Sequence, residues 1–185
     1  MREFEDIPWK KRQEEHYPLL EFKRLPSEEY GLLTKRLEAI LERRIEIISH
    51  VEHRKIKNSD SETGNFIHWD EVDVAFVSYL SACPLGNFHG TSFFKSHYSK
   101  SRHIHMPHET IKELPFIDPQ GCPENQLKEK LRSLTHDKNS WSEWLRIEAS
   151  TGRALIFPGR LFHAGPPAFG NDGTRITENF FAKFI

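Results

Sequence analysis

The sequence predicts a mainly β domain, a sandwich or barrel of short strands with helices packed on the outside. From Asn65 onward the chain consists of short apolar runs separated by turn residues, the pattern of closely spaced strands. The region before Asn65 contains apolar residues at helical spacing instead. A length of 185 residues, with 37% hydrophobic and 29% charged side chains, suits one globular domain, so we expect a single domain over residues 1–185.

The N-terminal part, about residues 1–56, is predicted to form a helical layer. Ser27 is a candidate N-cap, because two glutamates follow it and leucines and isoleucines then recur at helical spacing. This pattern predicts a helix from Ser27 to Arg43. The next run, RIEIISHVEHRKI, mixes in β-branched residues and indicates a strand. The polar stretch from Lys57 to Asn65 indicates a loop, after which the β core is expected to begin.

The β core, about residues 65–185, contains seven apolar runs that we interpret as strands: NFIHWD, VAFVSYLS, GTSFF, WLRIEAS, RALIFPG, LFHAG and RITENFFAKFI. Thr151-Gly152 predicts a tight hairpin between WLRIEAS and RALIFPG, and Pro158-Gly159 predicts a reversal before LFHAG. An insertion of about residues 95–140 separates the third run from the fourth and contains a predicted helix, PENQLKEKLRSL. Insertions of this length in a compact domain are often functional lids.

Charge and cysteine content give no support to several classes of partner. The 26 basic and 27 acidic side chains leave a net charge of -1, so no general field attracts nucleic acid or an anionic membrane. There is no apolar leader and no run of about 18 apolar residues, which predicts neither export nor a membrane span. Cys83 and Cys122 are too few for a disulfide framework, and a reducing, cytoplasmic setting fits best.

Three side chains suggest a metal site. His68 and Asp70 lie two residues apart in a predicted strand, so both point to the same face. His163, in the run LFHAG between two turn signals, is the candidate third ligand. Two imidazoles and one carboxylate on one face of an octahedron leave three positions open, which suits iron(II). The alternative is that His68 and Asp70 are ordinary polar residues of a strand edge.

The ordered series of runs resembles the core of the 2-oxoglutarate- and Fe(II)-dependent oxygenases. These runs are NFIHWDEVDVAFVSYLS, then GTSFF, then TGRALIFPGRLFHAGPPAFGNDGTRITENFFAKF. The closest likeness is to the prolyl-hydroxylase-like branch and its small bacterial and viral members, and it covers about residues 65–184 apart from the insertion. The resemblance implies a double-stranded β-helix, a jelly-roll or cupin-like fold, with the metal at the mouth of the barrel.

The resemblance also implies roles for particular residues. His68, Asp70 and His163 match the family's catalytic metal ligands. Arg175, twelve residues after His163, matches the arginine that binds the distal carboxylate of 2-oxoglutarate. Tyr79, before Leu80, and Thr177 match hydroxyl groups that help to bind the same carboxylate. A guanidinium can form two parallel hydrogen bonds with a carboxylate, which lysine cannot match.

The implied reaction is the hydroxylation of a small molecule or an amino-acid side chain, with peptide substrates also open. It consumes 2-oxoglutarate and O₂ and releases succinate and CO₂. Halogenating relatives have a small residue in place of the carboxylate that binds the metal, whereas Asp70 is intact here. The protein's part is to orient the reactants and to exclude water.

Two alternatives stay open at this point. The chain could be a non-catalytic or zinc-dependent β-barrel binding module that keeps the fold, or less readily a zinc hydrolase; either should tolerate Arg175→Ala. The cluster of His97, His103, His105 and His108 could bind a second metal. We favour the interpretation that this cluster belongs to a lid near the site.

Overall fold

A computed structural model describes residues 8, 10–11, 20–24, 30–55, 67–80, 90–97, 138–165 and 175–185 of the chain. At residues 11, 20–24, 53–55, 138 and 175 it describes the backbone alone. The elements in chain order are β1 (Lys10–Lys11), β2 (Leu20–Arg24), α1 (Tyr30–Leu41), β3 (Ile45–Lys55), β4 (Val74–Tyr79), β5 (Thr91–Ser96), η2 (Lys138–Ser140), β6 (Trp141–Ile147), β7 (Ala154–Pro158), β8 (His163–Ala164) and β9 (Arg175–Phe184).

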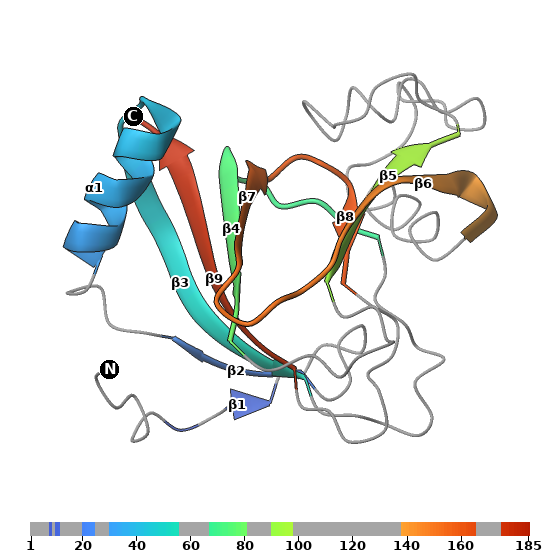
Figure 1. The fold of residues 1–185 in the computed structure, drawn as a ribbon, viewed down its shortest axis with the longest axis horizontal. Helices are drawn as coiled ribbons and strands as arrows, with labels where there is room; N and C mark the ends of the chain where they lie inside the picture. The colour runs from blue at the N-terminus through green and yellow to red at the C-terminus, as the bar shows by residue number, and fades with distance from the viewer. Residues whose placement is uncertain are drawn as a thin grey trace, which may run out of the picture.

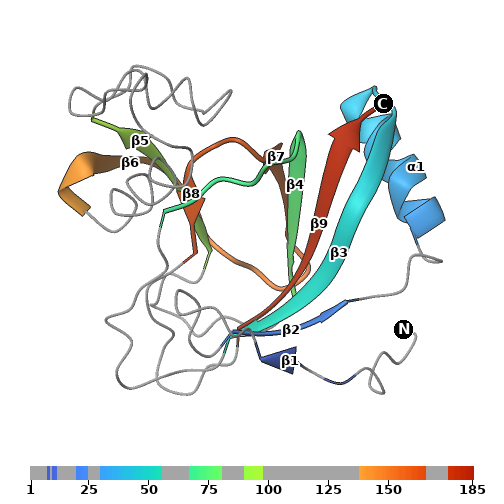
Figure 2. The same ribbon diagram turned by 180° about the vertical axis from the view of Figure 1, so that it is seen from behind.

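The strands form two antiparallel sheets (Figures 1 and 2). The large sheet has six strands in the order β1-β2-β3-β9-β4-β7, and the small sheet has three in the order β6-β5-β8. An isolated bridge between His68 and His163 adds the segment 67–70 beside β8. From β6 to β9, each strand lies in the other sheet from the strand before it, as in a jelly roll. This architecture confirms the predicted fold class.

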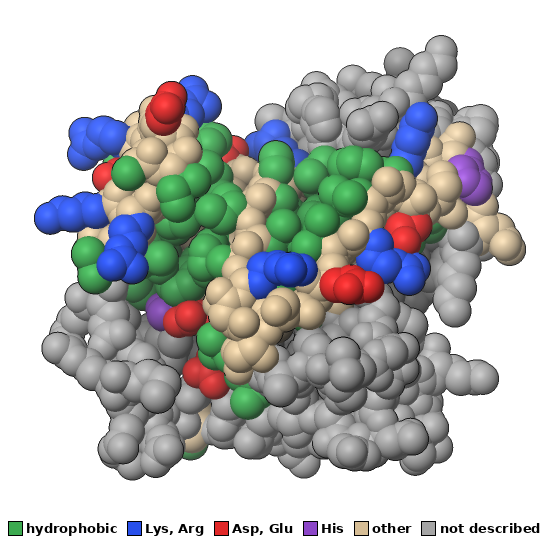
Figure 3. All heavy atoms as spheres, in the orientation of Figure 1, with side chains coloured by type: hydrophobic (Ala, Val, Ile, Leu, Met, Phe, Trp, Pro, Cys, Tyr) green, Lys and Arg blue, Asp and Glu red, His purple; other side chains and the backbone are tan. Residues whose placement is uncertain are grey.

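Helix α1 covers the outer face of the large sheet (Figures 1 and 2). Its buried Leu37 packs with Ile45, Val74 and Ala182 of three strands. Figure 3 shows basic side chains projecting from the helix, and hydrophobic ones where the helix meets the sheet. The helix ends at Glu42, whose positive φ of 53° is a common helix-ending conformation. The predicted helix is thus confirmed over Tyr30–Leu41, whereas its predicted cap, Ser27, lies outside the described residues.

The interior between the sheets is a second apolar cluster. Ala75 of β4, Phe93 of β5 and Phe157 of β7 are buried in contact with one another. Alternation along β4 explains the arrangement, because Val74 and Phe76 face the helix while Ala75 and Val77 face the interior. The large sheet is therefore covered on both faces, by α1 on one side and by the small sheet on the other.

Two predictions about local structure were wrong, the helical N-terminal layer and the hairpin at Thr151-Gly152. The N-terminal part is not a helical layer, because β1, β2 and β3 are strands of the large sheet and α1 is the one helix described in that part. The β core therefore begins well before residue 65. The strand predicted after the helix is confirmed as β3, which pairs with β9 along almost its whole length.

The turn at Thr151-Gly152 forms, but it does not make a hairpin. Arg153 N–H donates to Ser150 O at 2.8 Å, and Gly152 takes the positive φ of 80° that such a turn requires. However, β6 pairs with β5 in the small sheet, whereas β7 pairs with β4 in the large one. The turn is therefore a crossing between sheets. A local signal specifies the turn but not the partners of its strands.

Several predictions lie outside the described residues. They are the predicted helix PENQLKEKLRSL, both cysteines, His103, His105 and His108, and most of the insertion of about 95–140. The ends of that insertion are described: β5 extends to Ser96, and η2 begins at Lys138. The one α-helix in the described part of the chain is too short and too polar to cross a membrane.

Candidate metal centre

His68 and His163 lie side by side because their backbones are hydrogen-bonded to each other. His68 N–H donates to His163 O at 2.9 Å, and His163 N–H donates to His68 O at 2.8 Å. Residues directly opposite each other in an antiparallel pair point to the same face. The two rings accordingly lie with their centroids 4.3 Å apart. Two histidines that are distant in sequence are thus brought to one point.

Asp70 reaches the same point because the segment 67–70 is extended, and side chains two residues apart then share a face. Asp70 N–H donates to Gly159 O at 2.8 Å, which holds the segment against the turn after β7. A Cβ atom on Gly159 would lie 2.6 Å from the carbonyl oxygen of Val72. Only glycine permits this close approach of the two backbones.

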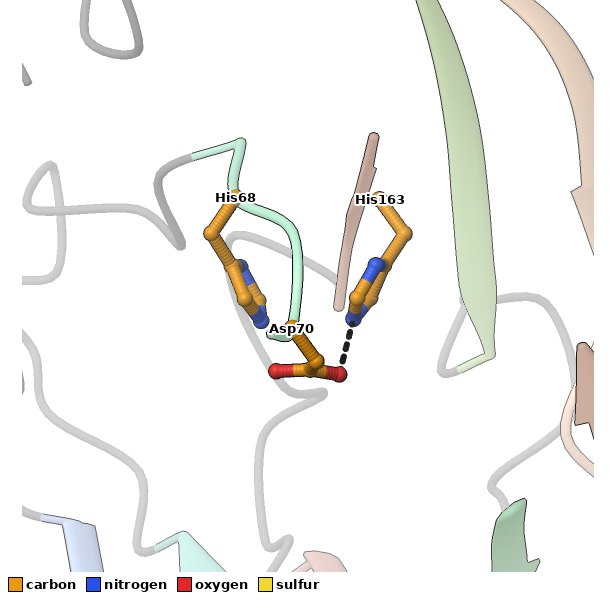
Figure 4. A group of neighbouring side chains, drawn as sticks. All are labelled: His68, Asp70 and His163. Atoms are coloured by element: carbon orange, nitrogen blue, oxygen red, sulfur yellow. Dashed lines mark ion pairs between the residues drawn. The ribbon is translucent and has the colours of Figure 1, made fainter. Parts of the chain in front are cut away.

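The three side chains converge on one small volume (Figure 4). One potential ligand atom from each of His68, Asp70 and His163 lies within 4.8 Å of the others. Within the described residues no other group of three such ligands lies so close together. The structure thus brings together the three residues predicted to bind metal. Two imidazoles and one carboxylate on the same side of an ion leave its remaining positions open.

The hydrogen-bond partners of His163 suit a cation at this site. Nδ1 donates to the carbonyl oxygen of Leu161 at 2.8 Å, since a carbonyl oxygen can only accept. In the neutral ring, Nε2 then carries a lone pair, and it faces Oδ2 of Asp70 at 3.5 Å. Two acceptors face each other without a proton between them. A metal ion satisfies both, and a histidine held through its other nitrogen is the usual arrangement of a metal ligand.

Burial keeps His163 in the neutral form that binds metal. Only 6% of its surface is exposed. Burial, and after it the charge of nearby His68, lowers the pKa of His163 to about 3, against an opposing effect of the hydrogen bond to Leu161. The ring is therefore uncharged at neutral pH, with its one proton on Nδ1. His68 and Asp70 are only partly buried.

The wall of the site is aromatic. The ring of His163 lies edge-on to Phe157 of the large sheet, with centroids 4.9 Å apart, and 6.4 Å from Phe93 of the small sheet. The ring therefore lies between the two sheets. An apolar wall lowers the local dielectric constant and strengthens interactions between the ligands and a bound cation.

The predicted co-substrate residues lie on the large sheet. Tyr79 and Thr177 are buried and are direct partners in the register of β4 and β9. Alternation along β9 and β4 places both on the interior face, with Val77 and Phe181. Arg175 is the first residue of β9, paired with Lys55 of β3, and its side chain is outside the described structure. The role of these three residues stays a prediction.

Two buried polar residues in the same region were not predicted. Thr91 of β5 lies within hydrogen-bond distance of Tyr79, 2.8 Å between the two hydroxyl oxygens. Asn179 of β9 donates from its amide to the hydroxyl oxygen of Thr177 at 3.2 Å. Alternation along β9 places positions 177 and 179 on one face, a signal that could have identified Asn179. No sequence signal connects Thr91 to Tyr79, because this contact joins two sheets.

Trp69, between the two ligands of the first segment, faces away from the metal centre. It packs edge-on against Phe162, with centroids 5.8 Å apart, in a cluster that includes Ile67 and Trp141. This cluster lies on the other side of the small sheet from the interior. The alternation that points His68 and Asp70 inward therefore also anchors their segment on the outside.

Comparison with known proteins places the chain in a family. A model described as a family of unknown function (DUF6445) matches residues 8–168, so the chain belongs to this family. No curated protein matches the chain in sequence. The family description assigns no activity, and the site must be interpreted from its own geometry.

Solved structures with a similar fold include proteins that bind or depend on 2-oxoglutarate. HygX from Streptomyces hygroscopicus, with nickel and 2-oxoglutarate bound, has a TM-score of 0.57 at 13% identity, covering 97% of this chain and 74% of HygX. The non-heme α-ketoglutarate-dependent carbocyclase SnoK from nogalamycin biosynthesis has a TM-score of 0.56 at 11% identity, covering 96% of this chain and 68% of SnoK. A 2OG-Fe(II) oxygenase family member from Burkholderia pseudomallei has a TM-score of 0.51 at 11% identity, covering 97% of this chain and 73% of that protein. At these identities the likeness shows the fold.

Proposed function

We propose that this chain is an Fe(II)- and 2-oxoglutarate-dependent dioxygenase that hydroxylates a small molecule or an amino-acid side chain. One observation carries the proposal: the lone pair of His163 Nε2 faces the carboxylate of Asp70 beside His68, a set that accommodates a cation and leaves positions open. The fold shared with HygX, which holds nickel and 2-oxoglutarate, supports it.

In this proposal His68, Asp70 and His163 hold the iron. Iron, 2-oxoglutarate and O₂ together supply the oxidising chemistry, in which one oxygen atom of O₂ enters succinate, CO₂ is released and the other oxygen atom enters the substrate as a hydroxyl group. The chain keeps His163 neutral through burial and orients its Nε2 through the Leu161 carbonyl. Phe93 and Phe157 exclude water from the inner side of the site.

We assign the distal carboxylate of 2-oxoglutarate to Arg175, Tyr79 and Thr177. The guanidinium supplies two parallel, charge-assisted hydrogen bonds, and the two hydroxyls add further donors. Tyr79 and Thr177 lie opposite each other on the interior face, which is where a co-substrate extending from the metal would lie.

The intact carboxylate of Asp70 favours hydroxylation over halogenation, since halide binding at iron needs that ligand position. For the substrate we favour a small molecule, because a second structure of HygX with the same fold holds hygromycin B as well as 2-oxoglutarate. Membership of the prolyl-hydroxylase-like branch and a cytoplasmic setting stay predictions.

Anaerobic titration of the purified chain with Fe(II), with and without 2-oxoglutarate, tests this function. We expect a weak visible charge-transfer band that requires both iron and 2-oxoglutarate. His68→Ala should abolish iron binding, whereas Arg175→Ala should retain iron and lose the band at ordinary 2-oxoglutarate concentrations. Arg146→Ala is the matched control for Arg175→Ala, because Arg146 is an exposed arginine of β6 whose guanidinium is paired with Glu143, and the variant should behave like the wild type.

Each failure has a distinct meaning. Iron binding without the band would leave the metal centre in place and overturn the use of 2-oxoglutarate. Zinc binding with no effect of Arg175→Ala on any activity would favour a zinc-dependent binding module. If no metal bound to the wild type, the metal centre itself would be refuted.

A further inference from the structure

Four buried polar side chains lie together on the interior face, and none of them is a sequence neighbour of a metal ligand. They are Tyr79 on β4, Thr91 on β5, and Thr177 and Asn179 on β9. None is more than 5% exposed, and their neighbours on the same faces are apolar. Buried polar groups in an apolar interior are costly unless they are hydrogen-bonded. The pattern of their bonds therefore carries information about what they do.

Asn179 sets the direction of the Thr177 hydroxyl. The amide nitrogen of Asn179 donates to Oγ1 of Thr177 at 3.2 Å. A hydroxyl group has one proton and two acceptor positions. Because the oxygen of Thr177 accepts from Asn179, its own proton must point to another acceptor. Asn179 thus keeps Thr177 as a donor toward the space that it faces.

Thr91 can act in the same way on Tyr79. The two hydroxyl oxygens are 2.8 Å apart, and either can donate. When an anion accepts the proton of Tyr79, the phenol oxygen is free to accept from Thr91. The bond crosses from the small sheet to the large one. It therefore fixes the phenol relative to both sheets, and hence relative to Phe93, which shares a face with Thr91 and lies against the metal ligand His163.

The two oriented hydroxyls come from neighbouring residues on one face of the large sheet. Tyr79 and Thr177 are direct register partners on neighbouring antiparallel strands and share the interior face. Side chains in this relationship have Cβ atoms about 5 Å apart. The phenol of Tyr79 reaches further from its strand than the hydroxyl of Thr177, and because both face the interior, one anionic group between the sheets can accept from both. A pair of donors, each held by its own buried partner, suits an anionic group better than a neutral one.

We propose that Thr91 and Asn179 are positioning residues that hold the Tyr79 and Thr177 hydroxyls as donors to the distal carboxylate of 2-oxoglutarate. This inference rests on the proposed function and adds two residues to it. Neither residue touches the co-substrate in this role. Each acts by donating to one acceptor position of a hydroxyl, so that the hydroxyl proton is presented to the ligand.

Binding of two keto acids to the Mn(II)-loaded chain tests the inference. 2-Oxoglutarate carries the distal carboxylate, whereas 2-oxobutyrate binds metal through the same keto-acid group but lacks it. We expect Thr91→Val and Asn179→Leu to weaken 2-oxoglutarate binding about tenfold each and to leave 2-oxobutyrate binding unchanged. Asn179→Asp should weaken 2-oxoglutarate binding more than Asn179→Leu does, because the new carboxylate accepts the Thr177 proton and repels the anionic ligand. Thr91→Ser keeps the hydroxyl and should retain wild-type binding.

Ser92→Ala is the matched control. Ser92 is a buried hydroxyl of the same strand, but it faces the other side, where it is hydrogen-bonded to Glu143. The Ser92→Ala variant should bind both keto acids with the affinity of the wild type. The Thr91 and Asn179 variants are independent, so a variant that fails to fold, as judged by circular dichroism, leaves the other to decide.

The outcomes separate this inference from the proposed function. Equal loss of both keto acids in the variants would show a general structural role and overturn the positioning role. Wild-type affinity of the variants for 2-oxoglutarate would also overturn it, while the proposed function stands. If the wild type bound 2-oxobutyrate and 2-oxoglutarate equally, or neither, the carboxylate site and the proposal built on it would both fail.

Discussion

His68 and His163 exchange both backbone hydrogen bonds, at 2.8 and 2.9 Å, and this pairing determines the metal centre. It is an isolated bridge rather than a long ladder, so the position of the two rings depends on the few contacts around it. One of these is the hydrogen bond from Asp70 N–H to Gly159 O, and another is the packing of Trp69 on Phe162. Changes in these contacts should alter metal binding without removing a ligand.

Gly159→Ala should weaken metal binding although residue 159 is not a ligand. The added Cβ would lie 2.6 Å from the Val72 carbonyl oxygen, a backbone atom that cannot move alone. The segment carrying Asp70 must then shift, and we expect a loss of about 1–3 kcal/mol in the free energy of unfolding. Thermal unfolding and Fe(II) titration under anaerobic conditions measure the two effects.

Gly31→Ala is the control for this substitution. Gly31 lies within α1 and a Cβ there would meet nothing within 4 Å. Residue 31 lies in the first turn of the helix, so alanine there should stabilise the fold by less than the about 0.5–1 kcal/mol of a helix interior and leave the metal affinity unchanged. If Gly159→Ala bound iron as tightly as Gly31→Ala, the close approach at Gly159 would not position Asp70.

The metal-free chain should lose stability as the pH falls from about 6.5 towards about 3, in part because of His163. Its pKa in the folded chain is lowered from 6.5 to about 3 by burial and by His68. Between these values the unfolded chain binds a proton that the folded chain does not, so acid favours unfolding, and the contribution is complete above about pH 6.5.

A comparison with His163→Gln isolates this contribution from other titrating groups. Melting temperatures measured in a chelator at about pH 7.5 and about pH 4.5 should differ more in the wild type than in the variant. Equal differences in the two proteins would mean that His163 titrates normally in the folded state and is not held neutral.

Asp70→Asn should reduce iron affinity strongly while preserving the fold. The amide has nearly the same shape, but it removes the negative charge that faces Nε2 of His163 at 3.5 Å. Loss of residues that only support a metal ligand costs about 10- to 100-fold in affinity, so loss of a ligand charge should cost at least about 100-fold. Equilibrium Fe(II) competition with a chromophoric chelator measures this. A near-wild-type affinity would show that Asp70 is not a ligand.

Turns and the residues that share a face of one strand could be predicted from the sequence, whereas the pairing of strands could not. His68 and Asp70 share a face because extended chains alternate, and His163 could be placed beside them through the family resemblance. By contrast, the strands on either side of Thr151-Gly152 were predicted to form a hairpin, whereas they belong to different sheets. Turn residues specify a change of direction, but long-range packing decides which strands pair.

The same limit explains why Thr91 was not predicted. Its contact with Tyr79 joins the two sheets across the interior, and the register of one sheet says nothing about the other. Asn179 is a different case, since its position two residues after Thr177 on β9 is visible in the sequence. It was missed because asparagine is not typical of a buried strand. A buried amide in such a strand is itself an indication that a neighbouring group needs its hydrogen bond.

Leu37→Ala should destabilise the fold without changing the metal centre. Leu37 is 2% exposed and packs on the face of the large sheet that is turned away from the small sheet. Its truncation should cost about 2–5 kcal/mol in unfolding free energy, since the cavity forms among well-packed residues. Leu32→Ala, on the same helix but with Leu32 64% exposed, should change stability by less than about 0.5 kcal/mol. Because His68 and His163 lie on the small sheet, iron affinity measured well below the melting temperature should match the wild type in both variants. A reduced iron affinity in Leu37→Ala alone would mean that the packing of α1 is coupled through the large sheet to Phe157 and the metal ligand that it contacts.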